Sequence, residues 1–396
     1  MVLTEKQQQG LNIAIERYKS GQKFTIISGY AGTGKSTLVK FIIDALPGID
    51  PEKNVVFASF TGKATEVLSK KGNKNTSTLH KLLFESIPRP DGTFFRRPVE
   101  EIPYDIVVVD EISMAPKSLI EQLMHYPVHV IGLGDPFQLP PVDKNEDNHL
   151  LDNPHIFLDE IMRQAAESEI IQLTMKIREG RPLELFKGKE VQVISKEELN
   201  TGMLMWADQI LVATNATRNR INNDMRMLLG REGEPQDGDK MICGRNYWDI
   251  ESNLASPLVN GCIGYLKNSY KSFNVIPAMF TENHSSLQVE TICGEFVSDA
   301  GEIYDNLMMD NKMIMTGEKS LDFKTEYKLN KNMRYKHLVP HDFLFGYAIT
   351  THRAQGSEWE KVLVIEEKFP FDKEEHARWL YTACTRASEK LVLVRS

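Results

Sequence analysis

Residues 29–36 read Gly29-Tyr-Ala-Gly-Thr-Gly34-Lys35-Ser36 and match the pattern G-x-x-x-x-G-K-[ST]. A β-branched run at residues 23–28 precedes this stretch, and a helical pattern over 35–46 follows it. Between a strand and a helix, such glycines let backbone N–H groups wrap around phosphates, and the helix N-terminus adds its positive end. We therefore expect a phosphate-binding loop in which Lys35 neutralises the β- and γ-phosphates and Ser36 offers its hydroxyl to Mg²⁺. The alternative is a glycine-rich turn with a surface lysine and no bound phosphate.

Strand and helix patterns alternate after this loop. A helical pattern covers residues 62–71, and three short apolar runs lie at residues 54–59, 106–109 and 128–133. Continuous apolar runs are expected of strands that are buried on both faces. The alternation predicts an α/β fold with a parallel sheet and right-handed crossovers. A second α/β sheet is predicted from further apolar runs at residues 209–213, 361–365 and 390–394.

Two segments interrupt the alternation. Residues 85–103 carry four prolines, the turn Pro90-Asp-Gly92 and the pair Phe94-Phe95, which predicts a small hairpin. Residues 260–337 are rich in glycine and asparagine and contain short β-like pieces, so we expect a small all-β insertion in the second α/β domain.

The composition is that of an ordinary globular protein. The 396 residues are 41% hydrophobic and 26% charged, which excludes wholesale disorder and predicts two to three domains. No apolar stretch approaches the ~18–20 residues of a membrane span, and the N-terminus lacks a secretory h-region, so we expect a cytosolic protein. The four cysteines are widely spaced, which favours free thiols over a zinc site. The net charge of −8 leaves the partner open, because steering depends on the local field.

Polar residues follow two of the predicted strands. Asp110 and Glu111 end the run at 106–109, where Asp110 would hold Mg²⁺ and Glu111 would orient or deprotonate an attacking water. Alternatively, both are solvated acids at the start of a helix. Gln138 follows the run at 128–133 and would report the γ-phosphate; the alternative is a Gly/Pro turn with a polar tip.

The order of these motifs resembles superfamily 1 helicases. The phosphate loop, Asp110-Glu111-Ile-Ser-Met114 and Gly134-Asp-Pro-Phe-Gln138 resemble motifs I, II and III. The remaining similarities are Phe60-Thr61-Gly62-Lys63-Ala64 to motif Ia, Leu158-Asp-Glu-Ile-Met-Arg163-Gln164 to motif IV, His352-Arg-Ala-Gln355-Gly356-Ser357-Glu358 to motif V, and Tyr381-Thr-Ala-Cys-Thr385-Arg386-Ala387 to motif VI. The chain is most similar to superfamily 1B, the RecD-like and phage Dda-like enzymes.

The resemblance implies two RecA-like P-loop domains with parallel sheets, a small hairpin insertion and a small all-β, SH3-like insertion. In this sequence, the first domain would span 1–155 with the hairpin at 84–103, the second 156–260 and 338–396, and the β-rich insertion 261–337. It further implies ATP and Mg²⁺ as cofactors, and an ATP-dependent helicase that moves 5′ to 3′ on single-stranded DNA and opens fork DNA. We expect a monomer in the cytoplasm of a bacterium or of a phage-infected host, with no membrane partner.

Several site residues follow from the resemblance. Arg386 and Arg163 would carry positive charge from the second domain to the transition state; surface ion pairing is the alternative. Gln7 would read adenine, although with Thr4 it would equally form a capping box. The expected nucleotide contacts are Gln7, Gly29, Gly32, Thr33, Gly34, Lys35, Ser36, Thr37, Gly356 and Glu358.

A nucleic-acid track is expected across both domains. Its candidate residues are Thr61, Lys63, Thr78, His80, Phe94, Phe95, His352, Gln355 and Ser357. Phe94 and Phe95 resemble the strand-separating pin of the family, with a small hydrophobic cluster as the alternative. Phe60 stands where the family usually has proline, which changes the local loop or supplies a base-stacking ring. Residues 324–336 interleave cations with aromatics and would follow a single strand, unless they form a solvated, charged strand.

Two rival functions remain open from the sequence. Phosphate and stacking contacts discriminate little between nucleic acids, so an RNA-directed motor of the same fold is the first rival. The second is a nucleic-acid-binding scaffold that ATP switches without unwinding.

Overall fold

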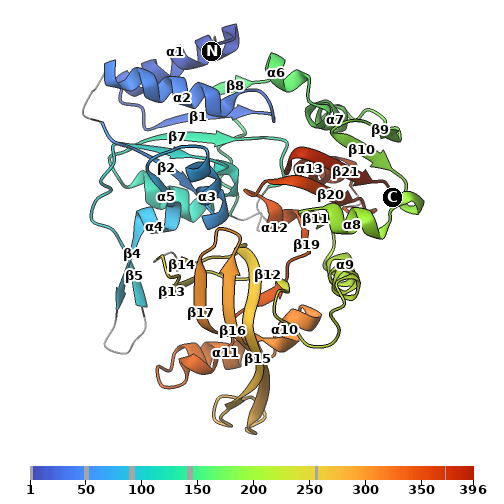
Figure 1. The fold of residues 1–396 in the computed structure, drawn as a ribbon. Helices are drawn as coiled ribbons and strands as arrows, with labels where there is room; N and C mark the ends of the chain where they lie inside the picture. Colours follow the sequence, from blue (N-terminus) through green and yellow to red (C-terminus); the bar gives the residue numbers. More distant parts are fainter. Residues whose placement is uncertain (1–2, 49–52, 89–93, 141–145, 255–256, 371) are drawn as a thin grey trace. The chain divides into compact units, whose positions relative to one another are not determined.

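The computed structural model describes residues 3–48, 53–88, 94–140, 146–254, 257–370 and 372–396, and it comprises two units (Figure 1). The first unit contains Met1–Glu85, Pro98–Ala213 and Thr351–Ser396, and the second contains Ser86–Arg97 and Thr214–Thr350.

A six-stranded parallel sheet organises the N-terminal part of the first unit, with the strand order β3-β2-β6-β7-β1-β8. Its strands are β1 (Phe24–Gly29), β2 (Val55–Ser59), β3 (Thr76–Thr78), β6 (Ile106–Val109), β7 (His129–Gly134) and β8 (Ile156–Leu158). The predicted parallel sheet is therefore confirmed. β8 lies beyond residue 155 but pairs with β1, so the first sheet extends into the segment predicted for the second domain.

Helices cover both faces of this sheet (Figure 1). They are α1 (Glu5–Lys19), α2 (Lys35–Ala45), α3 (Gly62–Lys70), α4 (Leu79–Leu83) and α5 (Lys117–Met124). Ile106 and Val108 pack with residues of α1 and α2, whereas Val107 and Val109 pack with residues of α4 and α5. Successive residues of β6 thus point into different cores, which explains its unbroken apolar sequence.

A second sheet organises the C-terminal part of the first unit, in the order β11-β20-β21-β10-β9. Its strands are β9 (Phe186–Lys187), β10 (Val191–Ile194), β11 (Gln209–Val212), β20 (Trp359–Ile365) and β21 (Ala387–Val394). All of these pairings are parallel except that of β9 with β10. The helices here are α6 (Arg163–Ala166), α7 (Glu169–Arg178), α8 (Thr201–Trp206), α12 (Thr351–Ala354) and α13 (Lys373–Cys384). α7 and α13 pack on each other and on β21.

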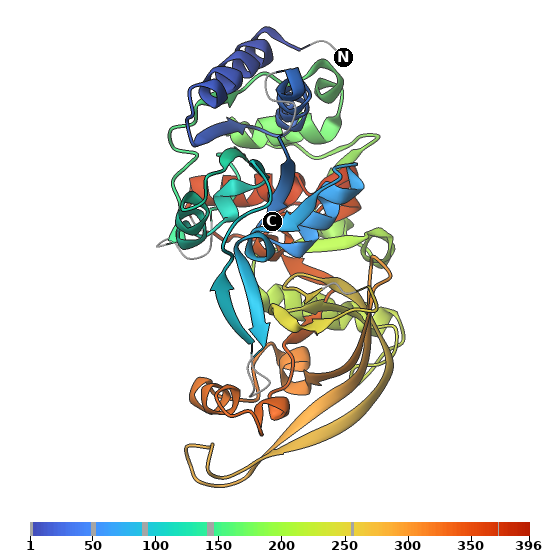
Figure 2. The same cartoon turned by 90° about the vertical axis from the view of Figure 1, so that its left-hand side faces the viewer.

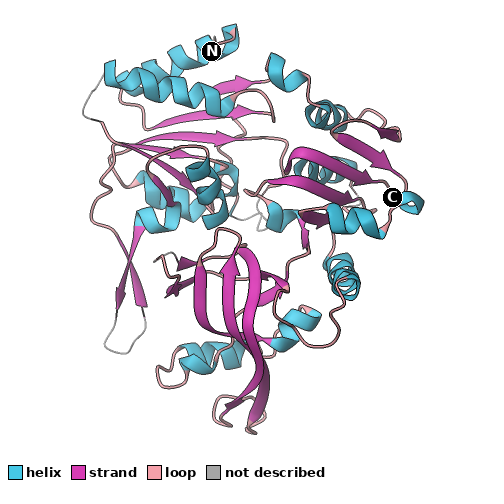
Figure 3. Cartoon of the chain, viewed as in Figure 1, coloured by secondary structure: helices cyan, strands magenta, loops and turns pink. Residues whose placement is uncertain are grey.

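The second unit contains an antiparallel sheet in the order β17-β16-β15-β12-β18 (Figure 3). Its strands are β12 (Lys240–Cys243), β15 (Ile263–Ile276), β16 (Leu287–Ser298), β17 (Ile303–Asp310) and β18 (Phe343–Phe345). β12 and β18 lie outside the predicted insertion 261–337. The long β15–β16 hairpin bends along its length (Figure 2) and has a bulge between Lys267 and Tyr270.

Other elements complete this unit: α9 (Asn215–Leu228), β13 (Tyr247–Glu251), β14 (Pro257–Leu258), α10 (Asn311–Thr316), α11 (Phe323–Asn330) and β19 (Ala348–Thr350). The prediction that residues 260–337 are all-β is wrong, because α10 and α11 lie within them. Asp310 and Asp322 cap these helices by accepting the N–H groups of Met313 and Thr325, and Gly317, at φ 83°, ends α10.

The predicted hairpin segment forms β4 (Phe84–Pro88) and β5 (Phe94–Pro98), which pair as a two-stranded sheet. Residues 89–93, between these strands in the sequence, lie outside the described residues.

Candidate active site

The phosphate-binding loop connects β1 to α2, as the sequence predicts. Gly32 and Gly34 have φ values of 77° and 80°, a left-handed conformation that glycine adopts at low cost. A Cβ on Gly34 would lie 2.4 Å from the Nε2 of Gln7, so any larger residue here would displace the Gln7 side chain. The Lys35 ammonium donates to the carbonyl oxygens of Gly29, at 2.6 Å, and Tyr30, at 3.0 Å. Its charge is thereby held over the loop at the N-terminus of α2.

Gln7 occupies a buried position beside this loop. Its Oε1 accepts the N–H of Thr4 at 3.1 Å, and the Thr4 side chain accepts the N–H of Gln7, so the predicted capping box is confirmed. Its Nε2 donates to the Thr33 carbonyl at 3.3 Å and to the Met162 sulfur at 3.2 Å. The cap thus fixes the amide against the loop and leaves one lone pair of Oε1 for a ligand.

Asp110 and Glu111 lie at the carboxyl end of β6, next to the phosphate loop. Glu111 has a φ of 50°, an uncommon conformation for a non-glycine residue and one that is concentrated at functional sites. Its backbone N–H donates to the Asp110 carboxylate at 3.1 Å. Burial raises the pKa of both carboxyls; Lys35 opposes this rise most strongly at Asp110, and Arg386 does so most strongly at Glu111. Gln138 donates from Nε2 to Glu111 Oε1 at 3.4 Å.

Arg386 is buried at the end of α13 and contributes positive charge to this carboxylate pair. Its guanidinium donates to the Thr382 carbonyl at 3.1 Å, the Ser357 carbonyl at 3.3 Å and the Thr385 hydroxyl at 3.2 Å. These three partners are neutral, so they orient the guanidinium without cancelling its charge. Within the first unit, the structure therefore brings together Lys35 of one sheet and Arg386 of the other around Glu111.

Side chains of α13 join the two sheets directly. The Tyr381 hydroxyl donates to the Asp135 carboxylate at 2.6 Å and accepts the Ala31 N–H of the phosphate loop at 2.8 Å. The Thr382 hydroxyl accepts the Leu139 N–H at 2.9 Å. These links connect α13, which precedes Arg386, to both the phosphate loop and the segment containing Gln138.

Gln355 lies in the same junction. Its side chain is buried and donates to the Leu139 carbonyl at 2.7 Å. We predicted Gln355 as a nucleic-acid contact from its motif, but its amide is engaged within the protein instead. Together with the Thr382 contact, this bond holds the peptide groups on both sides of Leu139.

Sequence reasoning missed Tyr381, Thr382 and Arg178 as site residues. The Arg178 guanidinium lies 3.7 Å from the ring centroid of Tyr30 in the phosphate loop, a cation–π contact. Arg178 belongs to α7, outside every motif, so no local pattern marked it. Tyr381 and Thr382 stand inside the motif VI segment, but only the fold shows that their hydroxyls reach Asp135 and Leu139.

Arg163 begins α6, and its side chain lies outside the described residues. The neighbouring backbone approaches the phosphate loop, since the Met162 N–H donates to the Gly32 carbonyl at 3.0 Å. The backbone that leads into α6 thus contacts the phosphate loop, and the role of Arg163 stays a prediction.

The predicted nucleic-acid residues of the first sheet lie around α3 and α4. Thr61 and Thr78 cap these helices by accepting the Ala64 and Lys81 N–H groups, each at 3.2 Å. His80 lies between two phenylalanine rings, those of Phe60 and Phe84, at centroid distances of 5.6 and 6.4 Å. Lys63 lies in the first turn of α3. Phe94 and Phe95 lie in β5, and their side chains are outside the described residues.

The motif V segment meets α3. Gly356 has a φ of 73°, and a Cβ there would lie 3.0 Å from the Cβ of Ala64. Glu358 pairs with Lys71, just beyond α3, at 3.2 Å. His352 lies on α12, where burial lowers its pKa, and Ser357 is buried. The structure thus brings the two predicted halves of the track into contact.

The donors present suit a magnesium ion. Ser36 and Thr37 are in the first turn of α2, Ser36 is exposed, and the Asp110 carboxylate is close enough to Lys35 to interact with its charge. Hydroxyl and carboxylate oxygens, completed by water and substrate phosphates, are typical Mg²⁺ ligands. Elsewhere in the described part of the chain, no group of three or more His, Cys, Asp or Glu residues is arranged to hold a metal.

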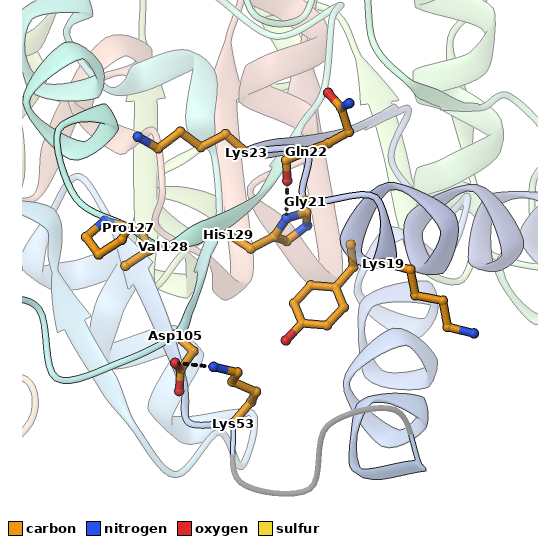
Figure 4. Close-up of a pocket in the computed structure, with 10 residues that line it drawn as sticks. Lys19, Gly21, Gln22, Lys23, Lys53, Asp105, Pro127, Val128 and His129 are labelled. Atoms are coloured by element: carbon orange, nitrogen blue, oxygen red, sulfur yellow. Dashed lines mark hydrogen bonds and ion pairs between the residues drawn. The ribbon is translucent and has the colours of Figure 1, made fainter.

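A separate cavity of about 620 Å³ opens at the other end of the first sheet (Figure 4). It is bordered by the residues that start β1, β6 and β7, and contains the Lys53–Asp105 ion pair at 2.9 Å. Ligands of parallel α/β sheets bind at the carboxyl ends of strands, so this cavity is not the nucleotide site.

Comparisons with known proteins agree with this arrangement. Residues 3–195 match the family model described as an AAA domain, and residues 345–394 match a UvrD-like helicase C-terminal domain. The chain is 26% identical over 386 residues to the ATP-dependent RecD2 DNA helicase of Deinococcus radiodurans, covering 94% of this chain and 47% of that protein. It is 31% identical over 194 residues to the ATP-dependent DNA helicase dda of Enterobacteria phage T4, covering 45% of this chain and 43% of that protein. The chain thus spans less than half the length of these curated relatives.

A solved structure shares the fold. The Pif1 helicase from Candida albicans aligns with a TM-score of 0.51 and 18% identity, covering 100% of this chain and 95% of that one. At this identity the likeness concerns the α/β fold with its parallel sheets. Within the described ranges, no helix combines the length and apolarity that a membrane crossing requires.

Proposed function

We propose, from the confirmed resemblance of this chain to superfamily 1B helicases, that it is an ATP-driven motor that translocates 5′ to 3′ on single-stranded DNA and unwinds duplex. The observation that carries the proposal is the direct bonding of α13, the helix that leads to Arg386, to the first sheet: Tyr381 bonds the phosphate loop and Asp135, and Thr382 bonds Leu139. A site built from two sheets can couple ATP turnover to their relative movement. The direction of movement rests on the resemblance alone.

In the hydrolysis step, Glu111 orients and deprotonates the attacking water, and Gln138 holds the Glu111 carboxylate through its 3.4 Å hydrogen bond. Lys35 neutralises the β- and γ-phosphates, and the Arg386 guanidinium, with Arg163 as a second candidate, neutralises charge that develops in the transition state. Ser36 and Asp110 would hold Mg²⁺, which would neutralise negative charge on the phosphates. The phosphates are cradled by Gly29, Gly32, Thr33, Gly34 and Thr37. Gln7 contacts adenine through the second lone pair of its Oε1.

Translocation requires two nucleic-acid grips whose affinity changes with the nucleotide. We assign one grip to Thr61, Lys63, Thr78 and His80, and the other to His352, Ser357 and the backbone near Gln355. The contact between Gly356 and α3 supports one continuous track. Closure around ATP then shifts the population between two arrangements of these grips.

The domain assignments follow from the same proposal. The two parallel sheets form two RecA-like domains, the first of which extends past residue 155 to β8, and the antiparallel sheet from β12 to β18 forms an SH3-like insertion that reaches beyond residues 261–337. The β4–β5 pair, with Phe94 and Phe95, acts as the strand-separating pin. The chain works as a monomer in the cytosol, on single-stranded and fork DNA.

Two assays test the proposal. ATP hydrolysis is measured with and without single-stranded DNA, and strand displacement is measured on duplexes with either a 5′ or a 3′ tail. We expect DNA-stimulated hydrolysis and unwinding of the 5′-tailed duplex, both lost in Lys35→Ala, which serves as the matched control. Failure to unwind either substrate defeats the helicase proposal. Binding and ATPase without displacement would indicate the ATP-switched scaffold, and stronger stimulation by a matched RNA oligonucleotide would indicate an RNA-directed motor.

A further inference from the structure

Helix α11 of the second unit carries an exposed aromatic pair. Phe323 is 82% exposed and Tyr327 is 50% exposed, whereas Thr325 and Leu329 on the opposite side of the helix are buried. The two rings are one helical turn apart, with centroids 6.2 Å apart and an interplanar angle of 21°, so they are stacked. Aromatic side chains exposed to this degree have one ring face available for a further planar group.

One cation lies directly beside this pair, and a second lies farther along the chain. The Lys331 ammonium lies 4.4 Å from the Tyr327 ring centroid, and Arg334 lies 5.7 Å from that of Tyr335. Lys331 and Arg334 are exposed, and the rings that they contact, Tyr327 and Tyr335, are neutral. By contrast, Lys324 and Lys336 pair with Glu282 and Asp249, each at 2.8 Å. Among the described residues, neither Lys331 nor Arg334 forms an ion pair, so no carboxylate contact offsets these cations.

The same face of α11 continues into a cavity. Phe323, Tyr327 and Asn330 follow at spacings of four and three residues and so share one side of α11, which ends at Asn330; Arg334 lies in the segment that follows the helix. Asn330 also lines a cavity of about 690 Å³, whose wall includes Arg245, Lys336 and His337. A linear polymer bound along α11 would thus contact aromatic, cationic and amide groups in succession.

We propose that the exposed side of α11 together with the segment that follows the helix, named here the α11 platform (Phe323, Tyr327, Lys331 and Arg334), is an additional contact site for single-stranded nucleic acid. One base stacks on Phe323, and Lys331 and Arg334 receive neighbouring phosphates. Single strands are bound by this combination of aromatic faces and a cationic path, whereas cores of protein interfaces are depleted in lysine. The inference rests on the proposed function, and extends it to a surface outside the two parallel sheets.

The first test removes the aromatic rings. In Phe323→Ala/Tyr327→Ala, affinity for a labelled oligothymidylate should fall about 5- to 30-fold, with an unchanged salt dependence, because base stacking and not charge is lost. The matched control is Phe273→Ala, since Phe273 is 58% exposed in the same unit but pairs across the sheet with Glu290. It should bind like the parent. In Phe323→Trp, binding should be retained, and tryptophan fluorescence should be quenched upon binding.

The second test removes the charges. In Lys331→Gln/Arg334→Gln, the slope of log affinity against log salt should become shallower by about 1.4, since each lost phosphate contact contributes about 0.7 for single strands. Blunt duplex, whose bases are already stacked, should bind equally to the parent and the double-alanine variant.

Unchanged oligothymidylate affinity in the double-alanine variant, or an equal loss for blunt duplex, would overturn the platform. Because these measurements need no ATP, they remain decisive if the parent shows no DNA-stimulated hydrolysis, the result that would instead defeat the proposed function. Unchanged basal ATPase and thermal unfolding in each variant show that the fold is intact.

Discussion

Tyr381→Phe tests whether the link between the sheets carries catalytic coupling. The substitution removes one hydroxyl and keeps a buried ring that packs edge-on against Phe137 at 5.2 Å. Two hydrogen bonds are lost, the 2.6 Å bond to the Asp135 carboxylate and the 2.8 Å bond from the Ala31 N–H. Burial raises the pKa of Tyr381, so the hydroxyl remains a donor at any ordinary pH.

The size of the effect follows from the chemistry of those bonds. A hydrogen bond to a charged group contributes ~1.5–3 kcal/mol, and a buried N–H left without a partner costs ~1–3 kcal/mol. Since the two terms share one hydroxyl and are not additive, we expect a total of ~2–4 kcal/mol. If the link acts in the transition state, kcat of DNA-stimulated hydrolysis falls ~30- to 1000-fold.

The assay is steady-state ATP hydrolysis at saturating single-stranded DNA, in which kcat and KM are determined separately. A positioning role predicts a loss in kcat with KM for ATP within about threefold, because binding by the phosphate loop itself persists. The matched control is Tyr304→Phe, another buried tyrosine whose hydroxyl bonds within the second unit, to Glu302 at 3.2 Å. It should lose stability but not kcat. A Tyr381→Phe enzyme with parental kcat would refute the reasoning.

Three further predictions concern other parts of the chain. Arg386→Ala should keep nucleotide binding, measured with a fluorescent ATP analogue, and lose ~10³–10⁵-fold in DNA-stimulated hydrolysis; a collapse of nucleotide affinity would make Arg386 a binding residue instead. Burial lowers the pKa of His341 to about 4, and its neutral Nδ1 accepts the Met308 N–H at 3.0 Å. The contribution of His341 to the free energy of unfolding is therefore full above pH ~6.5 and is lost as the pH falls towards ~4. The loss amounts to as much as ~3 kcal/mol. Denaturant unfolding across this range, with His341→Gln as the pH-insensitive comparison, checks the sign, and equal pH profiles would contradict it. Asp239→Ala should destabilise the second unit by ~3–5 kcal/mol in the same assay, because it leaves the buried Arg226, 3.2 Å away, without its carboxylate partner. A loss of stability below ~1 kcal/mol would show that this buried ion pair does not anchor the unit.

The sequence predicts the parts of the site that local patterns encode. The phosphate loop with Lys35 follows β1, and the two carboxylates follow β6. Both lie at the carboxyl edge of one parallel sheet, with only β7 between the two strands, so their shared edge follows once the sheet is predicted. The contacts of Tyr381 could not be predicted, because its partners Ala31 and Asp135 are hundreds of residues away and lie in ordinary loop sequence.

The same reasoning explains the errors in the second unit. The β15 strand continues through a bulge between Lys267 and Tyr270, where polar residues interrupt the apolar alternation on which strand prediction relies. In residues 311–330, cap residues and a short apolar side specify two helices. The exposed faces of these helices are so rich in charged residues that the sequence pattern predicts loop or strand there.

The backbone around Leu139 offers a physical route between ATP and nucleic acid. Its N–H is bound by Thr382, on the helix that leads to Arg386, and its carbonyl is bound by Gln355, in the segment resembling motif V. Gln138, the preceding residue, contacts Glu111. A displacement of this segment during hydrolysis must therefore strain or break a bond to the arginine-bearing helix, to the nucleic-acid segment, or to both. On the proposed assignment of the Gln355 segment to the nucleic-acid track, a single strand that orders this segment and ATP that orders Gln138 against Glu111 would change each other's affinity by the same factor, because coupling free energies between binding sites are reciprocal. Stimulation of hydrolysis by a single strand then needs no contact between the nucleic acid and the reacting phosphate.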